Sequence, residues 1–256
     1  MNYIFFILYT ALGCWLIARI KFVQRSGLKP ATIRGLFIVK ILAGAALGWM
    51  SIHFYGNKPS DNDYWMINEE SWKEYQLLLH HPKEYFSNIF HSPYSNGYSG
   101  FFNSLQSYWN DLKNNIIIKI VSVFNIFSQG NYYINSIFMN FIAFFGHVAF
   151  FRIFSNIYKE RKLSIIVGCF LLPSCLYFSS GLHKDAVVFS AIGLFCFALY
   201  SGIIQKFTIK KIIVLVLCSI VLLLIRSYVI VLVIPATAAY ILSVKKNWPA
   251  FPVFTT

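Results

Sequence analysis

Residue types that bind phosphate occur at unusual places in this chain. His183 and Lys184 stand beside Asp185 between two apolar runs in the stretch "SSGLHKDAVV", and Arg226 is the only charged residue in the apolar run 212–244. An imidazole, an ammonium group and a guanidinium can all donate hydrogen bonds to phosphate oxygens. We therefore predict that His183, Lys184 and Arg226 bind an anionic group.

Each of these residues also has a purely structural interpretation. The Ser-Ser-Gly sequence before Leu182 is typical of a helix end, and Asp185 is a suitable N-cap for the next helix. Arg226 can extend from a helical turn toward water along its own aliphatic stem. The sequence alone leaves the structural and the functional interpretation open.

Two carboxylates in the longest polar segment are candidates for catalysis. Asp61 and Asp63 lie at the start of a helical pattern that extends from Asn62 to about His80. A carboxylate beside a membrane can act as general base on a hydroxyl group, so Asp61 and Asp63 are the predicted catalytic residues. Ser60 and Asp63 also have the S-x-x-D spacing of a capping box, and Asp61 is itself a good N-cap. Capping and catalysis are compatible, and both stay open.

Motifs of soluble enzymes and of metal sites are absent from the sequence. The chain has no GxGxxG, GxxxxGK[ST], HExxH or GxSxG motif. His80 and His81 are adjacent and therefore cannot share one helical face as ligands at i and i+4 can. All five cysteines fall in apolar runs, where free Cys behaves as a small apolar residue. We predict no zinc site and no cofactor, and a divalent metal stays an open possibility.

The composition indicates which elements must position these residues. The chain is 57% hydrophobic and only 12% charged, and it contains several apolar runs that approach the roughly 20 residues needed to cross a bilayer. It is therefore expected to be an all-α polytopic transmembrane bundle of about seven spans. Five of the expected spans are residues 3–18, 35–52, 133–151, 163–178 and 186–204.

The last apolar run supplies the other two spans. A single helix over residues 212–244 would be about 50 Å long, whereas the hydrocarbon core is roughly 30 Å thick. Two short helices that turn near Arg226 fit better, and they place this arginine within the outer half of the membrane. An arginine inside the apolar zone costs roughly 2.5–3.5 kcal/mol, which makes it a functional candidate by default.

The distribution of charge predicts which face each connection occupies. Basic residues fill the connections "IARIKFVQRSGLKP", "YKERKL" and "QKFTIKK", which the positive-inside rule assigns to the cytoplasm. Seven of the nine acidic residues lie between residues 61 and 111, in a loop that is then outside. Residues 116–127 are too short to cross and are expected to lie in the outer interface. Because the basic residues are spread over short connections, we expect no nucleic-acid partner.

Four segments follow from this topology. Residues 1–55 hold two transmembrane helices, 56–131 form an extracytoplasmic acidic loop with interfacial helices, 132–246 form a five-helix bundle, and 247–256 form a short tail. Two further polar residues lie inside expected spans. Lys40 is expected to extend to the cytoplasmic interface, and His147 is expected to hydrogen-bond to a neighbouring helix.

An acidic outer loop followed by "NYYINSIFMNFIAFFGHVAFFRIF" and "LLPSCLYFSSGLHKDAVVFSAIGLFCFALY" is similar to bacterial polytopic glycosyltransferases of the GT-C type. The resemblance covers about residues 50–245. It implies transfer of a sugar from a polyprenyl-phosphate carrier at the outer face of the inner membrane, in cell-envelope polysaccharide synthesis. It also implies a catalytic base at Asp61 or Asp63, and a lipid phosphate held by His183, Lys184 and Arg226.

The chain is shorter than that class usually is, so the resemblance is to an N-terminal part or to a short form. Two alternatives remain beside the transferase. One is a non-catalytic membrane accessory subunit, whose outer loop would contact a membrane-protein partner. The other is a lipid-linked oligosaccharide polymerase, which would also use outer-face Arg and His residues. A transporter is less expected, because Pro173 and Pro235 do not form paired helix breaks in two halves.

Overall fold

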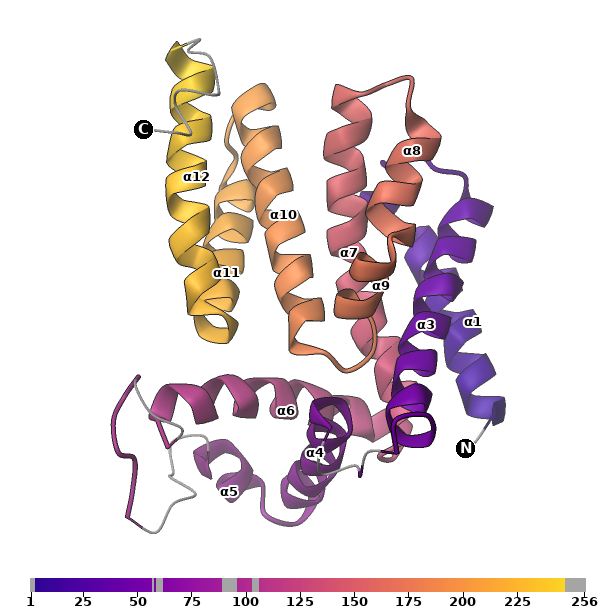
Figure 1. Ribbon diagram of the computed structural model, residues 1–256, viewed down its shortest axis with the longest axis vertical. Helices are drawn as coiled ribbons and strands as arrows, with labels where there is room; N and C mark the ends of the chain where they lie inside the picture. Colours follow the sequence, from indigo (N-terminus) through magenta and orange to yellow (C-terminus); the bar gives the residue numbers. More distant parts are fainter. Residues whose placement is uncertain (1–2, 57, 59–61, 89–95, 103–105, 247–256) are drawn as a thin grey trace.

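A computed structural model gives the fold of the chain and describes residues 3–56, 58, 62–88, 96–102 and 106–246. Long apolar helices stand side by side in a bundle, and a layer of shorter helices lies across one end of it (Figure 1). Within the described residues the only β pairing is an isolated bridge between Gly100 and Ser107. The fold is therefore all-α, as the sequence predicts.

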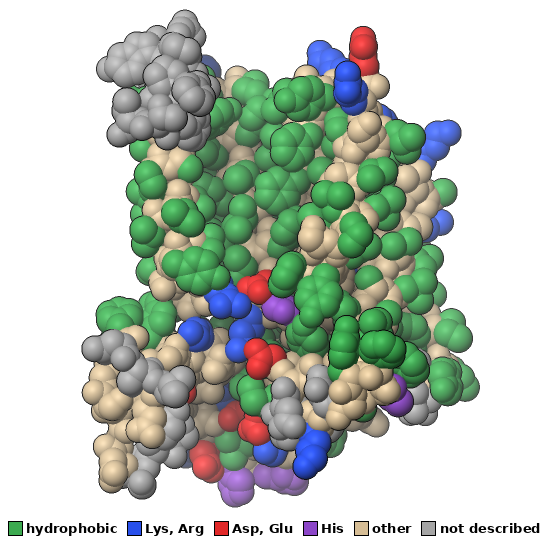
Figure 2. Space-filling model, in the orientation of Figure 1, with side chains coloured by type: hydrophobic (Ala, Val, Ile, Leu, Met, Phe, Trp, Pro, Cys, Tyr) green, Lys and Arg blue, Asp and Glu red, His purple; other side chains and the backbone are tan. Residues whose placement is uncertain are grey.

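In the described part of the chain, four helices are long and apolar enough to cross a membrane by themselves. They are α3 (Pro30–His53), α7 (Tyr132–Ile157), α10 (Lys184–Gln205) and most of α12 (Ser227–Lys246). Hydrophobic side chains cover the flank of the bundle from end to end (Figure 2). Because such a surface is stable only in lipid, these helices indicate an integral membrane protein.

The expected span over 163–178 is not one continuous helix. It consists of α8 (Lys162–Ile166), a π-helical turn, η3 (Val167–Leu171), and α9 (Pro173–Ser179), with a bend of 42° at the break. The cause is Pro173, which has no N–H to donate to the preceding turn and clashes with it. Counting this bent pair as one span gives five.

Two further apolar helices have 17 residues each: α1 (Tyr3–Arg19) and α11 (Ile209–Ile225). This is at the lower limit of the length that crosses a hydrocarbon core. The predicted turn near Arg226 is confirmed, since α11 ends at Ile225, Arg226 is its C-cap and α12 begins at Ser227. Seven crossings remain a prediction.

Helices α7 and α10 form the centre of the bundle and approach each other through glycines. A Cβ atom on Gly146 would lie 2.6 Å from the Cα of Ser190, and one on Gly193 would lie 2.6 Å from the carbonyl oxygen of Gly146. Neither distance is possible for a real side chain. Small residues at such crossings let the backbones pack closely, which is how helices associate in lipid.

The layer at the end of the bundle consists of α4 (Asp63–His80), α5 (Pro82–Ser87) and α6 (Tyr108–Ser128), and we call it the end layer. Helix α6 contains the segment 116–127 and lies across the bundle, not along it (Figure 1). Its buried residues, such as Ile117 and Val121, recur at helical spacing and face α4 and the bundle.

Buried asparagines fix the end layer to the bundle. The side-chain nitrogen of Asn135 on α7 donates to Asn68 Oδ1 on α4 at 2.9 Å and to Asn125 Oδ1 on α6 at 2.7 Å. Asn125 in turn donates to Ser71 Oγ at 3.1 Å. Because these side chains are buried, each lost partner would leave a desolvated polar group.

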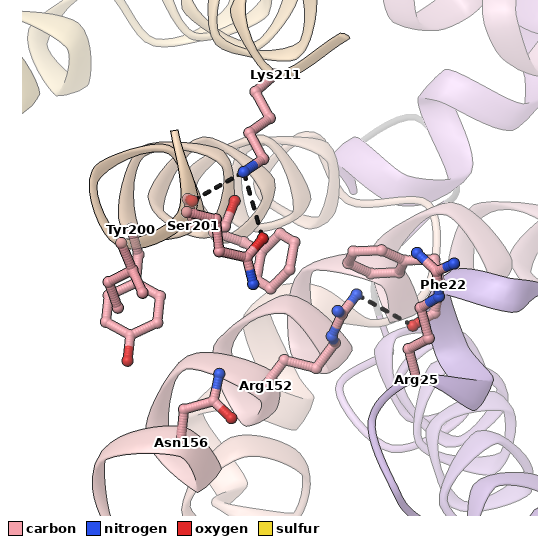
Figure 3. A pocket seen from close by; sticks show the side chains of 10 residues that line it. Phe22, Arg25, Arg152, Asn156, Tyr200, Ser201 and Lys211 are labelled. Carbon is pink, nitrogen blue, oxygen red and sulfur yellow. Dashed lines mark hydrogen bonds between the residues drawn. The ribbon is translucent and has the colours of Figure 1, made fainter. Parts of the chain in front are cut away.

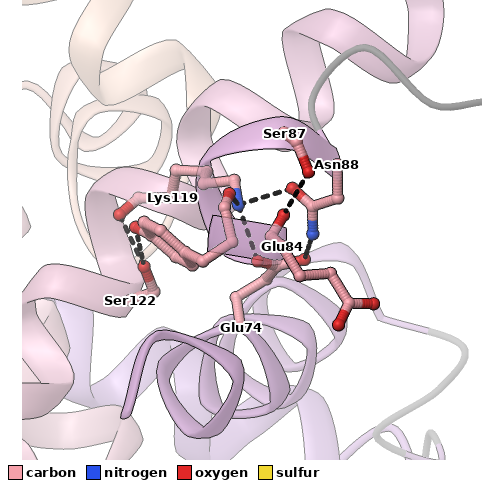
Figure 4. A network of polar contacts seen from close by, with 7 residues as sticks. Glu74, Glu84, Ser87, Asn88, Lys119 and Ser122 are labelled. Carbon is pink, nitrogen blue, oxygen red and sulfur yellow. Dashed lines mark hydrogen bonds and ion pairs between the residues drawn. The ribbon is translucent and has the colours of Figure 1, made fainter. Parts of the chain in front are cut away.

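A second polar network holds α5 against α6 (Figure 4). Lys119 Nζ lies 2.7 Å from Glu74 Oε2 and 2.7 Å from Asn88 Oδ1, and it also donates to the carbonyl oxygen of Tyr85. The Tyr85 ring lies below the same ammonium group at 3.6 Å. The acidic character of this segment is thus partly structural, since Glu74 neutralises a lysine within the layer.

The basic connections lie at the end of the bundle opposite the end layer. The short helix α2 (Lys21–Gln24) and the links before α8 and α11 are all at that end (Figure 1). The segregation of basic connections from the acidic layer follows the charge asymmetry in the sequence. That the end layer faces outward stays a prediction of the positive-inside rule.

Candidate functional site

Arg226 forms a two-point ion pair with Asp185. Its Nε donates to Asp185 Oδ1 at 3.0 Å, and its Nη2 donates to Asp185 Oδ2 at 3.3 Å. The two side chains are only 35% and 27% exposed. The pair joins the α11–α12 turn to the first turn of α10, so Arg226 does not simply extend into water.

The N-cap of α10 is His183 and not Asp185, which corrects the sequence prediction. The backbone N–H of Asp185 donates to His183 Nδ1 at 3.1 Å, while the Asp185 carboxylate is turned toward Arg226. The arginine is the stronger partner, because the bond to it is charge-assisted. Gly181 precedes this cap with φ of +73°, which agrees with the expected end of the preceding helix.

The capping contact also determines which proton His183 carries. When Nδ1 accepts the backbone N–H, the neutral ring holds its proton on Nε2. Burial lowers the pKa of His183, and the charges of Arg226 and Lys184 lower it further, while Asp185 and Asp63 raise it. The neutral ring can therefore donate one hydrogen bond from Nε2 to a ligand. The centre of the His183 ring lies 5.1 Å from the ring centre of Tyr64 and 6.2 Å from that of Phe178.

Lys184 begins α10 and is half-buried between the bundle and the end layer. In the described part of the chain it makes no hydrogen bond and no ion pair, although the charges of Asp63, Arg226, Lys113 and Asp185 all act on it. Lys113 is a cation that sequence reasoning missed. Its only sequence signal is its position on α6, where it donates to Asn110 Oδ1 at 2.5 Å.

Asp63 is the first residue of α4, and its side chain is exposed. The helix is capped by Asn62, whose side chain accepts the N–H of Tyr64 at 3.0 Å, so the predicted cap at Asp61 is wrong. Asp61 itself, like Ser60, lies outside the described residues. Asp63 is thus not needed as a cap, and its charge acts on both His183 and Lys184.

The structure brings most of the predicted site residues together. Asp63 lies at the start of α4, Arg226 lies in the α11–α12 turn, and Lys113 lies on α6. The start of α10 contributes the other three residues, His183, Lys184 and Asp185. We call this set the junction site. Figure 2 shows Lys, Arg, Asp, Glu and His side chains gathered where the bundle meets the end layer. Three cations face two carboxylates there, so an anionic group would be attracted.

An aromatic pair lies beside the junction site and was also missed. The hydroxyl of Tyr64 on α4 donates to the hydroxyl of Tyr177 on α9 at 3.4 Å. Burial and the neighbouring phenol of Tyr177 raise the pKa of Tyr64, so it stays a neutral hydrogen-bonding group. The two rings connect the end layer to the broken span next to His183.

Lys40 does not extend to the interface, which corrects the prediction for that residue. It is 2% exposed, and its ammonium group lies 2.6 Å from the carbonyl oxygen of Ser179, 2.7 Å from Ser179 Oγ and 3.0 Å from His147 Nε2. The predicted hydrogen bonding of His147 with a neighbouring segment is confirmed: its Nδ1 donates to the Cys169 carbonyl, and its Nε2 lies 2.8 Å from Ser179 Oγ. These contacts tie α3, α7 and α9 together.

Metal binding finds no support in the arrangement of the described residues. No group of three or more His, Cys, Asp or Glu side chains among them could hold a metal ion. Asp63 and Asp185 are instead surrounded by cations. The junction site therefore favours an anion over a cation.

Comparison of the whole chain with protein-family models, with curated proteins and with solved structures gives no match.

Proposed function

We propose that this protein is a membrane glycosyltransferase of the cell envelope, and that the junction site holds the phosphate of a polyprenyl-phosphate-linked sugar. One observation supports the proposal: where apolar helices end, Arg226 pairs with Asp185 next to His183 and Lys184, and the start of α4, with Asp63, lies against His183 through Tyr64. A lipid carrier needs this combination, because its chain must stay in the bilayer while its phosphate reaches polar donors.

Each group has a distinct task in the proposed reaction. Lys184 and the Nε2–H of His183 donate to the phosphate oxygens, and the paired guanidinium of Arg226 contributes a further positive charge. Asp63 takes the proton of the acceptor hydroxyl. The acceptor oxygen bonds to the anomeric carbon of the sugar, and the bond from that carbon to the phosphate oxygen breaks. The lipid phosphate leaves with its negative charge stabilised by the cations.

The proposal requires the end layer to face the outside of a bacterial inner membrane. Single cysteines in a cysteine-free background test this sidedness, at exposed Glu84 in the end layer and at exposed Lys210 at the opposite end. An impermeant maleimide added to intact cells should label position 84 and not position 210. The opposite pattern would place the junction site in the cytoplasm and overturn the proposal.

Lipid binding is tested on the full chain in nanodiscs with undecaprenyl phosphate as the probe. Lys184→Gln should weaken binding roughly tenfold, the typical effect of one charge-assisted hydrogen bond. Lys83→Gln, which removes an exposed lysine of the end layer, is the matched control and should bind as the wild type does. Equal binding by both variants would show that Lys184 does not bind the lipid phosphate, and would contradict the proposed phosphate site.

Transfer is tested separately, by following the release of labelled hexose from polyprenyl-phosphate-hexose when an acceptor with a free hydroxyl group is present. Asp63→Asn should abolish release and leave undecaprenyl phosphate binding intact, since the carboxylate acts on the acceptor. The control is Glu69→Gln, which removes another exposed carboxylate of α4. Wild-type release by Asp63→Asn would exclude Asp63 as the base.

A second candidate function is favoured by the ion pair of Arg226 with Asp185. Because these two charges already neutralise each other, the junction site also suits a non-catalytic accessory subunit that holds a lipid phosphate for a partner enzyme. Such a protein would bind undecaprenyl phosphate through Lys184 and release no hexose with any acceptor. The two assays together therefore separate the transferase from the accessory subunit.

A further inference from the structure

A pocket at the end of the bundle opposite the junction site carries an unbalanced positive charge. Its volume is about 300 Å³, and its walls come from the α2 region, α7, α10 and α11. Three cations line it, Arg25, Arg152 and Lys211 (Figure 3). Among the described residues that line it none carries a carboxylate, and in the described part of the chain none of the three cations forms an ion pair.

Arg152 is held in place by two aromatic rings and by one hydrogen bond. Its guanidinium carbon lies 4.7 Å from the ring centre of Phe22 and 4.2 Å from that of Phe197, and its Nη1 donates to the carbonyl oxygen of Phe22 at 3.3 Å. A guanidinium has five N–H donors, and in the described part of the chain Arg152 makes one hydrogen bond. The two rings orient the group without neutralising it.

The other two cations add charge from different elements. Lys211 donates to the carbonyl oxygens of Ser201 at 2.8 Å and Lys206 at 3.0 Å, which fixes its ammonium group beside the end of α10 but leaves its charge uncompensated. Arg25 follows α2, its side chain is exposed, and its charge acts on Arg152. Like charges held together in this way repel one another until an anion joins them.

We propose that this pocket binds a phosphate group, held chiefly by Arg152 with Arg25 and Lys211 around it. The amide of Asn156 and the hydroxyl of Tyr200 also line the pocket, together with apolar Phe197 and Ile204. A wall that is cationic in one part and apolar in another fits a phosphate joined to an apolar body. The phosphate can come from the headgroup of an anionic membrane lipid or from a soluble phosphate compound.

The experiment uses the delipidated full chain in detergent, with native mass spectrometry to count bound lipids. Phosphatidylglycerol and phosphatidylcholine are added in separate titrations, and inorganic pyrophosphate is then added as a soluble competitor. The wild type should bind phosphatidylglycerol about tenfold more tightly than phosphatidylcholine. Arg152→Gln should remove this preference, and Arg25→Gln, at an exposed position, should reduce it about threefold.

Arg34→Gln is the matched control, since it removes an exposed arginine at the same end of the bundle that does not line the pocket. Arg34→Gln should keep the wild-type preference. If pyrophosphate displaces the lipid, or binds when phosphatidylglycerol does not, the natural ligand is a soluble phosphate compound. If phosphatidylglycerol binds and pyrophosphate does not displace it, the ligand is the lipid headgroup. The proposal is overturned if the wild type binds neither probe selectively, or if Arg34→Gln weakens binding as much as Arg25→Gln does.

Discussion

The guanidinium of Arg226 and the carboxylate of Asp185 bind each other through two hydrogen bonds, at 3.0 and 3.3 Å, across the junction of the α11–α12 turn with the start of α10. The pair explains how an arginine is accommodated at the end of two apolar helices: its charge is balanced locally. It also orients the residues that flank it, because Asp185 supplies the N–H that His183 accepts.

This ion pair should stabilise the fold measurably. A double-mutant cycle with Asp185→Ala and Arg226→Ala should give a coupling energy of about 1 kcal/mol, since both groups are partly exposed and screened by water. Unfolding in detergent micelles, followed by circular dichroism, provides the measurement. The pair of Lys73 with Glu70, at 69% and 43% exposure, is the control and should couple more weakly. Equal coupling in the two cycles would mean that Arg226 gains nothing from its position.

The stability of the protein should fall in mild acid because of His183. Burial lowers the pKa of this residue in the folded state below the value of about 6.5 that it has in an unfolded chain. The unfolded state therefore takes up the proton first as pH falls, and the folded state loses stability from about pH 6.5 downward. Protonation of Nδ1 also removes the acceptor that caps α10.

His183→Asn tests this pH dependence, because Asn can still cap the helix but does not titrate. The unfolding temperature of the wild type should fall more than that of His183→Asn between about pH 7 and about pH 5. Parallel curves for the two proteins would contradict the assignment of the pH effect to His183.

Lys40 should be a structural residue of the bundle. Lys40→Ala removes a buried side chain and takes away the ammonium group that donates to the Ser179 carbonyl and contacts His147 Nε2, so it should destabilise the protein by about 2 kcal/mol or more. Lys29→Ala is the control, since Lys29 is exposed just before the same helix and its side chain makes no capping bond. The thermal unfolding of both variants in detergent provides the test. Similar losses in the two variants would show that the contacts of Lys40 contribute nothing.

Local features of the sequence predicted much of the fold. The sequence predicts a helix from Asn62 to about His80, and α4 is found from Asp63 to His80. It predicts a turn near Arg226, and the structure has the break between α11 and α12 there. Apolar periodicity, helix length and Pro or Gly positions act over a few residues, and therefore they can be read from the chain directly.

Predictions that depended on a choice between neighbours were less reliable. Asp185 was the expected N-cap of α10, but His183 caps the helix, because Arg226 draws the Asp185 carboxylate away from the helix end. Lys40 was expected to reach the interface, but the bend after Leu172 brings Ser179 within hydrogen-bond distance. Neither outcome can be derived from one helix alone.

The sequence by itself determined that this is an all-α chain with membrane-spanning helices, a basic end and an acidic layer, since these follow from composition and from patterns within each segment. Only the tertiary structure decided which charges meet. Asp63, Lys113, His183, Lys184 and Arg226 come from separate elements, and their approach depends on how α4 and α6 lie across the ends of α10 and α11. Packing between distant segments, which periodicity does not encode, therefore creates both the junction site and the cationic pocket at the opposite end.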